Sequence, residues 1–207
     1  MEAVNINGTK ELTVADLRRA NVPENYWYCT LASIPENLEY RKQVISYYAQ
    51  MESFLGKGIG LYLFSSDNQT GKTSIAIALL KRALKLKKTA FFSEAGTLKN
   101  ALSKNEDFED HTLLEQRIKN VDLLVIDDLG KEYRTSSGYA ENTFENIFRS
   151  RIQALKPLIV TGNMLPKDIE KTYSTSLAAL LKGSLIPVQV SGYNWSVEKQ
   201  KELKQTL

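Results

Sequence analysis

Residues 61–80 read LYLFSSDNQTGKTSIAIALL, and they are the most informative part of the sequence about the fold. Four apolar residues typical of a strand come first, a polar loop follows, and an Ala/Leu-rich run typical of a helix ends it. Gly71, Lys72 and Thr73 fit the end of the P-loop pattern G-x-x-x-x-G-K-[ST], while Ser66 stands where the pattern has its first glycine. A GKT tripeptide can occur by chance at a helix start, but its place between a strand and a helix favours a phosphate-binding loop.

This loop predicts the contacts that a bound nucleotide would make. Backbone N–H groups of such a loop, and of the helix that follows it, cradle phosphate oxygens. The expected ATP-binding residues are Ser66, Asp67, Asn68, Gln69, Thr70, Gly71, Lys72, Thr73 and Ser74. Lys72 is expected to reach the β- and γ-phosphates, and the Thr73 hydroxyl to ligate Mg²⁺. Because the loop lacks the usual glycines and carries Asp67 near the polyphosphate, we expect nucleotide binding to be weak or slow.

A second motif, VDLLVIDDLG at 121–130, is an apolar strand that ends in two aspartates. We expect Asp127 to hold Mg²⁺ through water, and Asp128 to orient or deprotonate the water that attacks the γ-phosphate. The alternative is a strand that ends in a solvated Asp-Asp turn. The presence of the P-loop in the same chain favours the catalytic interpretation.

A third strand end, PLIVTGN at 157–163, finishes in Asn163. Ligands of parallel sheets bind outside the carboxyl ends of the strands, so Asn163 is expected to hydrogen-bond the γ-phosphate or the attacking water. A simple Gly-Asn turn is the alternative. The predicted catalytic groups are therefore Lys72, Asp128 and Asn163.

The pattern along the chain predicts an α/β fold with a five-stranded parallel sheet covered by helices on both faces. The expected strands are 61–64, 89–92, 122–126, 157–161 and 186–190, and the expected helices are 12–20, 36–55, 73–87 and 140–155. We expect a short N-terminal extension at 1–35, which is a candidate for partner contact, an ATPase core at 36–196 and a tail at 197–207.

Composition and charge exclude several other classes. Hydrophobic residues make up 43% and charged residues 25% of the 207-residue chain, as in soluble globular proteins, and the net charge of +3 is no nucleic-acid-binding signature by itself. Cys29 is the only cysteine, which excludes an internal disulfide. The polar N-terminus does not resemble a signal peptide, and the apolar runs are too short to cross a bilayer. We therefore expect a cytoplasmic protein without membrane contact.

Together these motifs resemble the DnaC/DnaI-type helicase loaders, a branch of the AAA+ ATPases that includes the IstB transposition helpers. The resemblance extends from about residue 20 to residue 196. It is carried by ANVPENYW (20–27), GLYLFSSDNQTGKT (60–73), VDLLVIDDLGKE (121–132), FENIFRSRIQALKPLIVTGNMLP (144–166) and VQVSGYN (188–194). It implies an AAA+ core with a reduced or absent C-terminal lid, ATP and Mg²⁺ as cofactors, and ATP-dependent contact with single-stranded DNA and a replicative hexameric helicase.

By the same resemblance, three residues gain roles. Asp128 stands where many AAA+ proteins carry a catalytic glutamate, Asn163 matches the sensor-1 position, and Arg151 matches an arginine usual before the sensor strand. The arginine-finger segment of the family corresponds here to YSTSLAALL (173–181), which contains no arginine, and Ser196 replaces a later sensor arginine. Lys171 and Lys182 are candidate substitutes, although lysine lacks the planar fork of arginine. ATP hydrolysis is therefore expected to be weak.

Some assignments stay open at this stage. Lys99 and Lys104 are candidate DNA contacts, and self-association is a further candidate interaction. The aromatic cluster that contains Tyr26 and Trp27 could stack on adenine or on a partner, but packing against the sheet is the favoured interpretation. Besides helicase loading, the sequence is compatible with an IstB-like transposition helper, or with a low-turnover adaptor that inhibits or redirects a host helicase or loader.

Overall fold

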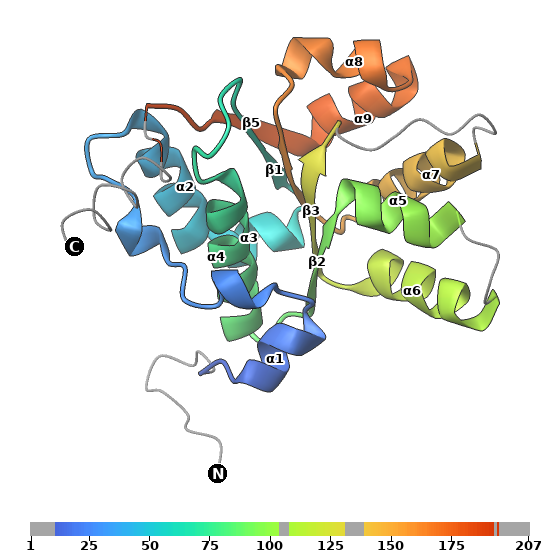
Figure 1. The fold of residues 1–207 in the computed structure, drawn as a ribbon, viewed down its shortest axis with the longest axis horizontal. Coiled ribbons are helices and arrows are strands. Elements are labelled where there is room, and N and C mark those ends of the chain that lie inside the picture. Colours follow the sequence, from blue (N-terminus) through green and yellow to red (C-terminus); the bar gives the residue numbers. More distant parts are fainter. Residues whose placement is uncertain (1–10, 104–107, 131–138, 193, 195–207) are drawn as a thin grey trace, which may run out of the picture.

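The computed structural model describes residues 11–103, 108–130, 139–192 and 194, and its centre is a five-stranded parallel sheet (Figure 1). The strands are β1 (Gly60–Phe64), β2 (Ala90–Glu94), β3 (Leu123–Leu129), β4 (Leu158–Gly162) and β5 (Leu185–Gln189). They lie in the order β2-β3-β4-β1-β5, and every neighbouring pair is parallel. Each strand begins within one residue of its predicted start, which confirms the predicted α/β fold.

Helices cover both faces of this sheet (Figure 1). One face carries α1 (Val14–Arg19), the 3₁₀ turns η1 (Glu24–Tyr26) and η2 (Leu31–Ser33), α2 (Glu39–Ala49), α3 (Met51–Gly56) and α4 (Lys72–Lys85). The other carries α5 (Ala95–Ser103), α6 (Phe108–Asn120), α7 (Tyr139–Gln153), η3 (Pro166–Asp168), α8 (Ile169–Thr172) and α9 (Thr175–Ser184). The single helix expected at 36–55 is divided at Gln50, which leaves the helical conformation at ψ 15°. Among the described helices, none is long and apolar enough to cross a membrane.

The sheet holds the two layers together because its strands are apolar on both sides. All five residues of β1 are buried, and they alternate between the faces. Leu61 and Leu63 join the core beneath α4, whereas Tyr62 and Phe64 join the core beneath α7 and α9. This period of two is what a strand buried on both faces requires.

The segment before residue 35 packs onto the same body. Leu17, Ala20 and Val22 are buried in the core of the first face. The Phe92 N–H on the edge strand β2 donates to the Ala20 carbonyl at 2.9 Å, and the Asn21 side chain donates to the Phe92 carbonyl at 2.9 Å. These bonds occupy backbone groups of an open sheet edge. A separate partner-binding role for residues 1–35 stays a prediction, as does the boundary of the tail, which lies outside the described residues.

A buried arginine ties the amino ends of two strands to the end of α6. The Arg151 side chain is fully buried, and its guanidinium donates to the carbonyls of Ile118 (2.6 Å), Val121 (2.9 Å), Pro157 (3.0 Å) and, more weakly, Lys119 (3.3 Å). Burial lowers the pKa of Arg151 to about 10, while the charge of Asp122 raises it. The side chain therefore remains a cation at neutral pH and connects α6, β3 and β4.

Candidate nucleotide site

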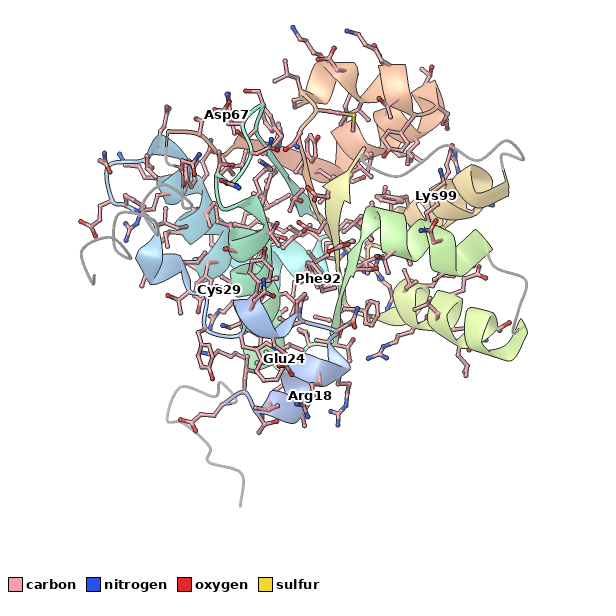
Figure 2. All side chains as sticks on the ribbon, in the orientation of Figure 1. Arg18, Glu24, Cys29, Asp67, Phe92 and Lys99 are labelled. Atoms are coloured by element: carbon pink, nitrogen blue, oxygen red, sulfur yellow. The ribbon has the colours of Figure 1, made fainter. Side chains whose placement is uncertain are left out.

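The phosphate loop joins the carboxyl end of β1 to the first turn of α4, as the sequence predicts. Gly71 precedes the helix with φ of 90°, a left-handed conformation that costs glycine little. Gln69 has φ of 60°, which is strained for a residue with a Cβ. The loop therefore adopts a tight turn even though its usual glycines are replaced. Figure 2 shows Asp67 in this loop, beyond the end of the sheet.

Lys72 is folded back into the loop. Its side chain is buried, and its Nζ donates to the Asp67 carbonyl at 3.0 Å and to the Thr70 hydroxyl at 3.3 Å. A buried ammonium group needs oxygen acceptors, and the loop supplies them here. Phosphate oxygens could take over this role, because the ammonium already lies where the loop and the helix N-terminus converge.

Thr73 and Asp127 lie together although 54 positions separate them in the chain. The Thr73 hydroxyl lies 3.0 and 3.1 Å from the two Asp127 carboxylate oxygens, and the Thr161 hydroxyl donates to Asp127 Oδ1 at 2.6 Å. Burial raises the pKa of Asp127, the Thr161 hydrogen bond lowers it, and the charge of Asp128 raises it again. Thr161 has a role that the sequence analysis missed; a threonine inside an apolar strand was the only signal for it.

Asp128 reaches the same site because of a bulge in β3. Successive residues of a regular strand point to opposite faces. The register of β3 against β4 shifts between Ile126 and Leu129, and Asp128 has a left-handed φ of 58°. Its backbone N–H donates to the Thr161 hydroxyl at 3.0 Å. Both aspartates are thereby held at the carboxyl end of the sheet.

A cavity of about 590 Å³ opens beside these groups. It is lined by Tyr26, Asn68, Gln69, Thr70, Gly71, Lys72, Thr73, Ser74, Asp128 and Asn163. Ser66 and Asp67, two of the predicted nucleotide-binding residues, are not among the lining residues. Asp127 does not line the cavity either, but it contacts Thr73, which does. The structure thus brings Asn163 to the phosphate loop, where its side-chain amide donates to Asn68 Oδ1 at 3.2 Å.

The residues present fit a Mg²⁺–triphosphate. Asn163 Oδ1 is buried and has no hydrogen-bond partner among the described residues, as expected of a polar atom prepared for a ligand. Among the described residues, no three His, Cys, Asp or Glu side chains gather as a metal cluster. Mg²⁺ in nucleotide sites does not need one, since phosphates and waters fill most of its octahedral positions. Thr73 and Asp127 are enough as the protein's share of the ligands.

Tyr26 enters this site from the segment before the core. Burial raises the pKa of its hydroxyl, the charges of Asp127 and Asp128 raise it further, and hydrogen bonding with the Thr73 side chain acts in the opposite direction. Packing was the favoured interpretation of the aromatic cluster. Both Tyr26 and Trp27 are partly buried against the core, and Tyr26 lines the cavity as well.

Of the two candidate DNA contacts, Lys99 and Lys104, the structure describes only Lys99. The Lys99 side chain on α5 is only 4% exposed, so its ammonium is not offered to the open surface in this packing (Figure 2). Lys104 lies outside the described residues. Contact of either lysine with DNA stays a prediction, and for Lys99 it would require the helix to repack.

The segment 173–181, where the family resemblance places an arginine finger, forms the start of α9. The Ser176 hydroxyl accepts a hydrogen bond from the Arg149 guanidinium at 2.7 Å. The two candidate substitutes are engaged in ion pairs, Lys171 with Asp168 at 2.6 Å and Lys182 with Glu170 at 3.3 Å. Ser196 lies outside the described residues.

A five-stranded parallel sheet in this strand order, with a phosphate loop after its first strand, defines the P-loop NTPase fold of the AAA+ type. No protein-family model and no curated protein matches the sequence. Solved structures do match. DnaI has a TM-score of 0.69 at 20% identity over 82% of this chain and 94% of its own, and the DnaC helicase loader has 0.67 at 20% over 82% and 100%.

Replication initiator proteins share the fold as well. A DnaA structure bound to AMPPCP and single-stranded DNA matches with a TM-score of 0.67 at 20% identity, over 85% of this chain and 55% of its own. At such identities the likeness shows the fold alone. It confirms the AAA+ architecture that the motifs predicted, with helicase loaders among the structures similar to this chain.

Proposed function

We propose that this chain is an ATP- and Mg²⁺-dependent AAA+ ATPase that loads or remodels a replicative hexameric helicase on single-stranded DNA during the initiation of replication. The observation that carries the proposal is the contact between the Thr73 hydroxyl and the Asp127 carboxylate at 3.0 Å, directly beside Lys72 at the N-terminus of α4. That arrangement presents one cation, one hydroxyl and one carboxylate to the same small volume, as Mg²⁺–triphosphate binding requires.

Each residue then has a chemical task. Lys72 exchanges its loop acceptors for β- and γ-phosphate oxygens and neutralises their charge. Thr73 and Asp127 would hold Mg²⁺, which would polarise the terminal phosphate when bound. Asp128 orients the attacking water and accepts its proton, and Asn163 hydrogen-bonds the water or the terminal phosphate. Phosphoryl transfer asks little more of a protein than positioning and charge stabilisation.

The partner assignment is supported by the folds of the similar structures. DnaI and the DnaC helicase loader match over 94% and 100% of their chains, so nearly all of each matched chain resembles this one. The DnaA structure carries single-stranded DNA and an ATP analogue. We infer the same class of partners for this chain.

The test is native mass spectrometry of the protein mixed with the replicative helicase of its own organism or host, with and without ATP. We expect a defined complex whose stoichiometry changes when ATP is added, and no such change for the Lys72→Ala variant. If no complex forms in either condition, the helicase is not the partner, and the nucleotide assignment must be judged separately by ATP binding.

A second candidate is a nucleotide-binding adaptor with little turnover, which blocks or redirects a helicase or a loader. Its support is the absence of arginine from 173–181 together with the ion pairs that engage Lys171 and Lys182. An arginine finger accelerates phosphoryl transfer by orders of magnitude where it operates. Tight ATP binding without turnover, even with helicase and single-stranded DNA present, would favour the adaptor over the loader.

A further inference from the structure

The segment 22–30, called the strap below, packs against α4 and is hydrogen-bonded to it at Ser74 and Lys81. Lys81 of α4 donates to the carbonyls of Trp27 at 2.6 Å and Cys29 at 2.7 Å. The Cys29 thiol donates to the Ser74 carbonyl at 3.5 Å, one residue beyond Thr73. Figure 2 shows Cys29 in front of α4. The strap is therefore attached to the helix that begins the phosphate site.

Further contacts fix the conformation of the strap itself. The Trp27 indole N–H donates to the Val22 carbonyl at 2.9 Å, and the Arg18 guanidinium lies 5.6 Å from the centre of the Trp27 ring. Tyr26, the last residue of the 3₁₀ turn Glu24–Tyr26, lines the candidate nucleotide cavity. Of these two adjacent residues, Tyr26 lines the cavity, whereas Trp27 contacts Arg18 and Val22 of the N-terminal segment.

The Tyr26 hydroxyl lies in the part of the site where Mg²⁺ and the terminal phosphate of ATP are expected. The Thr73 side chain is close enough to act on the Tyr26 hydroxyl, and the charges of Asp127 and Asp128 act on it as well. A phenol hydroxyl in this position can donate a hydrogen bond to an oxygen of a ligand bound in the cavity. Oxygens of the bound triphosphate are the acceptors that a ligand would bring into this cavity.

We propose that Tyr26 is a nucleotide-binding residue whose hydroxyl donates a hydrogen bond to a triphosphate oxygen of ATP·Mg²⁺ and thereby couples nucleotide binding to the position of the strap. The inference rests on the proposed nucleotide site and adds to it a residue from outside the phosphate loop and the strand ends. It also gives the segment before the core a way to respond to nucleotide.

The test compares Tyr26→Phe, which removes only the hydroxyl, with Tyr28→Phe as a matched control. Tyr28 belongs to the same strap but is 90% exposed. Calorimetric titration with AMPPCP and Mg²⁺ is expected to show affinity lowered about tenfold or more in Tyr26→Phe, the usual effect of losing a hydrogen bond to a charged group, and unchanged in Tyr28→Phe. Thermal unfolding without nucleotide checks that both variants keep the fold.

A second measurement uses the fluorescence of Trp27 to report on the position of the strap. In a Trp195→Phe background, Trp27 is the only tryptophan, because the chain has two. Its fluorescence is expected to change when AMPPCP and Mg²⁺ saturate the protein, and the change is expected to be smaller in Tyr26→Phe at the same saturation. The readout does not depend on hydrolysis.

The outcomes separate this inference from the proposed function. If the wild type binds nucleotide, Lys72→Ala does not, and Tyr26→Phe equals the wild type in both measurements, Tyr26 has no part in binding and only this inference falls. Tighter binding by Tyr26→Phe would also overturn it, because the hydroxyl would then compete with the ligand. If the wild type binds no nucleotide, both proposals fail together.

Discussion

Replacing Arg151 by methionine should destabilise the protein more than any change on its surface. The substitution keeps much of the side-chain volume but leaves the carbonyls of Ile118 and Val121 without the donors that now lie 2.6 and 2.9 Å away. The Pro157 carbonyl loses its donor at 3.0 Å and keeps only the longer bond of 3.4 Å from the Leu124 N–H. Each buried carbonyl without a donor costs about 1–3 kcal/mol. The variant no longer buries a charge, which offsets part of the loss, so we expect a net cost of about 3–5 kcal/mol.

Such a loss is large against a total stability of about 5–15 kcal/mol for a folded domain. At about 2–4 °C per kcal/mol for a chain of this size, the midpoint of thermal unfolding should fall by about 6–20 °C. The assay is urea unfolding followed by far-ultraviolet circular dichroism, with the same denaturant dependence expected for variant and wild type.

Arg149→Met is the matched control, on the same helix. Its side chain is 38% exposed and its guanidinium pairs with Glu145 at 3.0 Å, and pairs of this kind contribute about 0–1 kcal/mol. The reasoning is refuted if Arg151→Met costs less than about 1 kcal/mol, or no more than Arg149→Met. Either result would mean that water replaces the guanidinium at these carbonyls at little cost.

The remaining predictions concern the nucleotide site. Lys72→Ala should weaken ATP binding about a hundredfold or more in calorimetry, and equal affinity in variant and wild type would disprove the phosphate-loop assignment. Asp128→Asn should leave ATP affinity intact and slow hydrolysis about 10²–10⁴-fold in a phosphate-release assay; loss of binding instead would argue against its role as the base. Burial raises the pKa of Asp127 above its unfolded value, so the ionised group opposes folding at neutral pH. Asp127→Asn should therefore raise the nucleotide-free unfolding midpoint by about 2–4 °C while removing Mg²⁺-dependent ATP binding, and a lower midpoint would contradict this reasoning.

Local patterns were sufficient for the strands and the phosphate loop. The run 61–80 contains its own strand, turn residues and helix start within twenty consecutive positions, and the structure has β1, the loop and α4 there. Such signals depend on periodicity and on the demands of the local backbone, and both are properties of neighbouring residues. The aspartates and Asn163 could be placed at one edge because parallel strands present their carboxyl ends together.

Other features depend on contacts between distant segments. The bulge that turns Asp128 toward the site arises from the pairing of β3 with β4, and no residue type in VIDDLG requires it. Lys99 was a candidate DNA contact because it follows the second strand, where the family resemblance places such contacts, yet the packing buries its side chain. Position along a helix does not by itself tell which charged side chains will be covered.

By itself, the sequence determined which residues could bind phosphate and metal, and in what kind of fold. Three contacts depend on the tertiary structure alone. Thr73 contacts Asp127, and the Thr161 hydroxyl hydrogen-bonds to both aspartates. Tyr26 reaches the cavity from the segment that precedes the first strand. The physical reason is that these contacts follow from sheet order and from the path of the strap across α4. Both are set by burying apolar surface throughout the molecule, and no short pattern in the sequence contains that information.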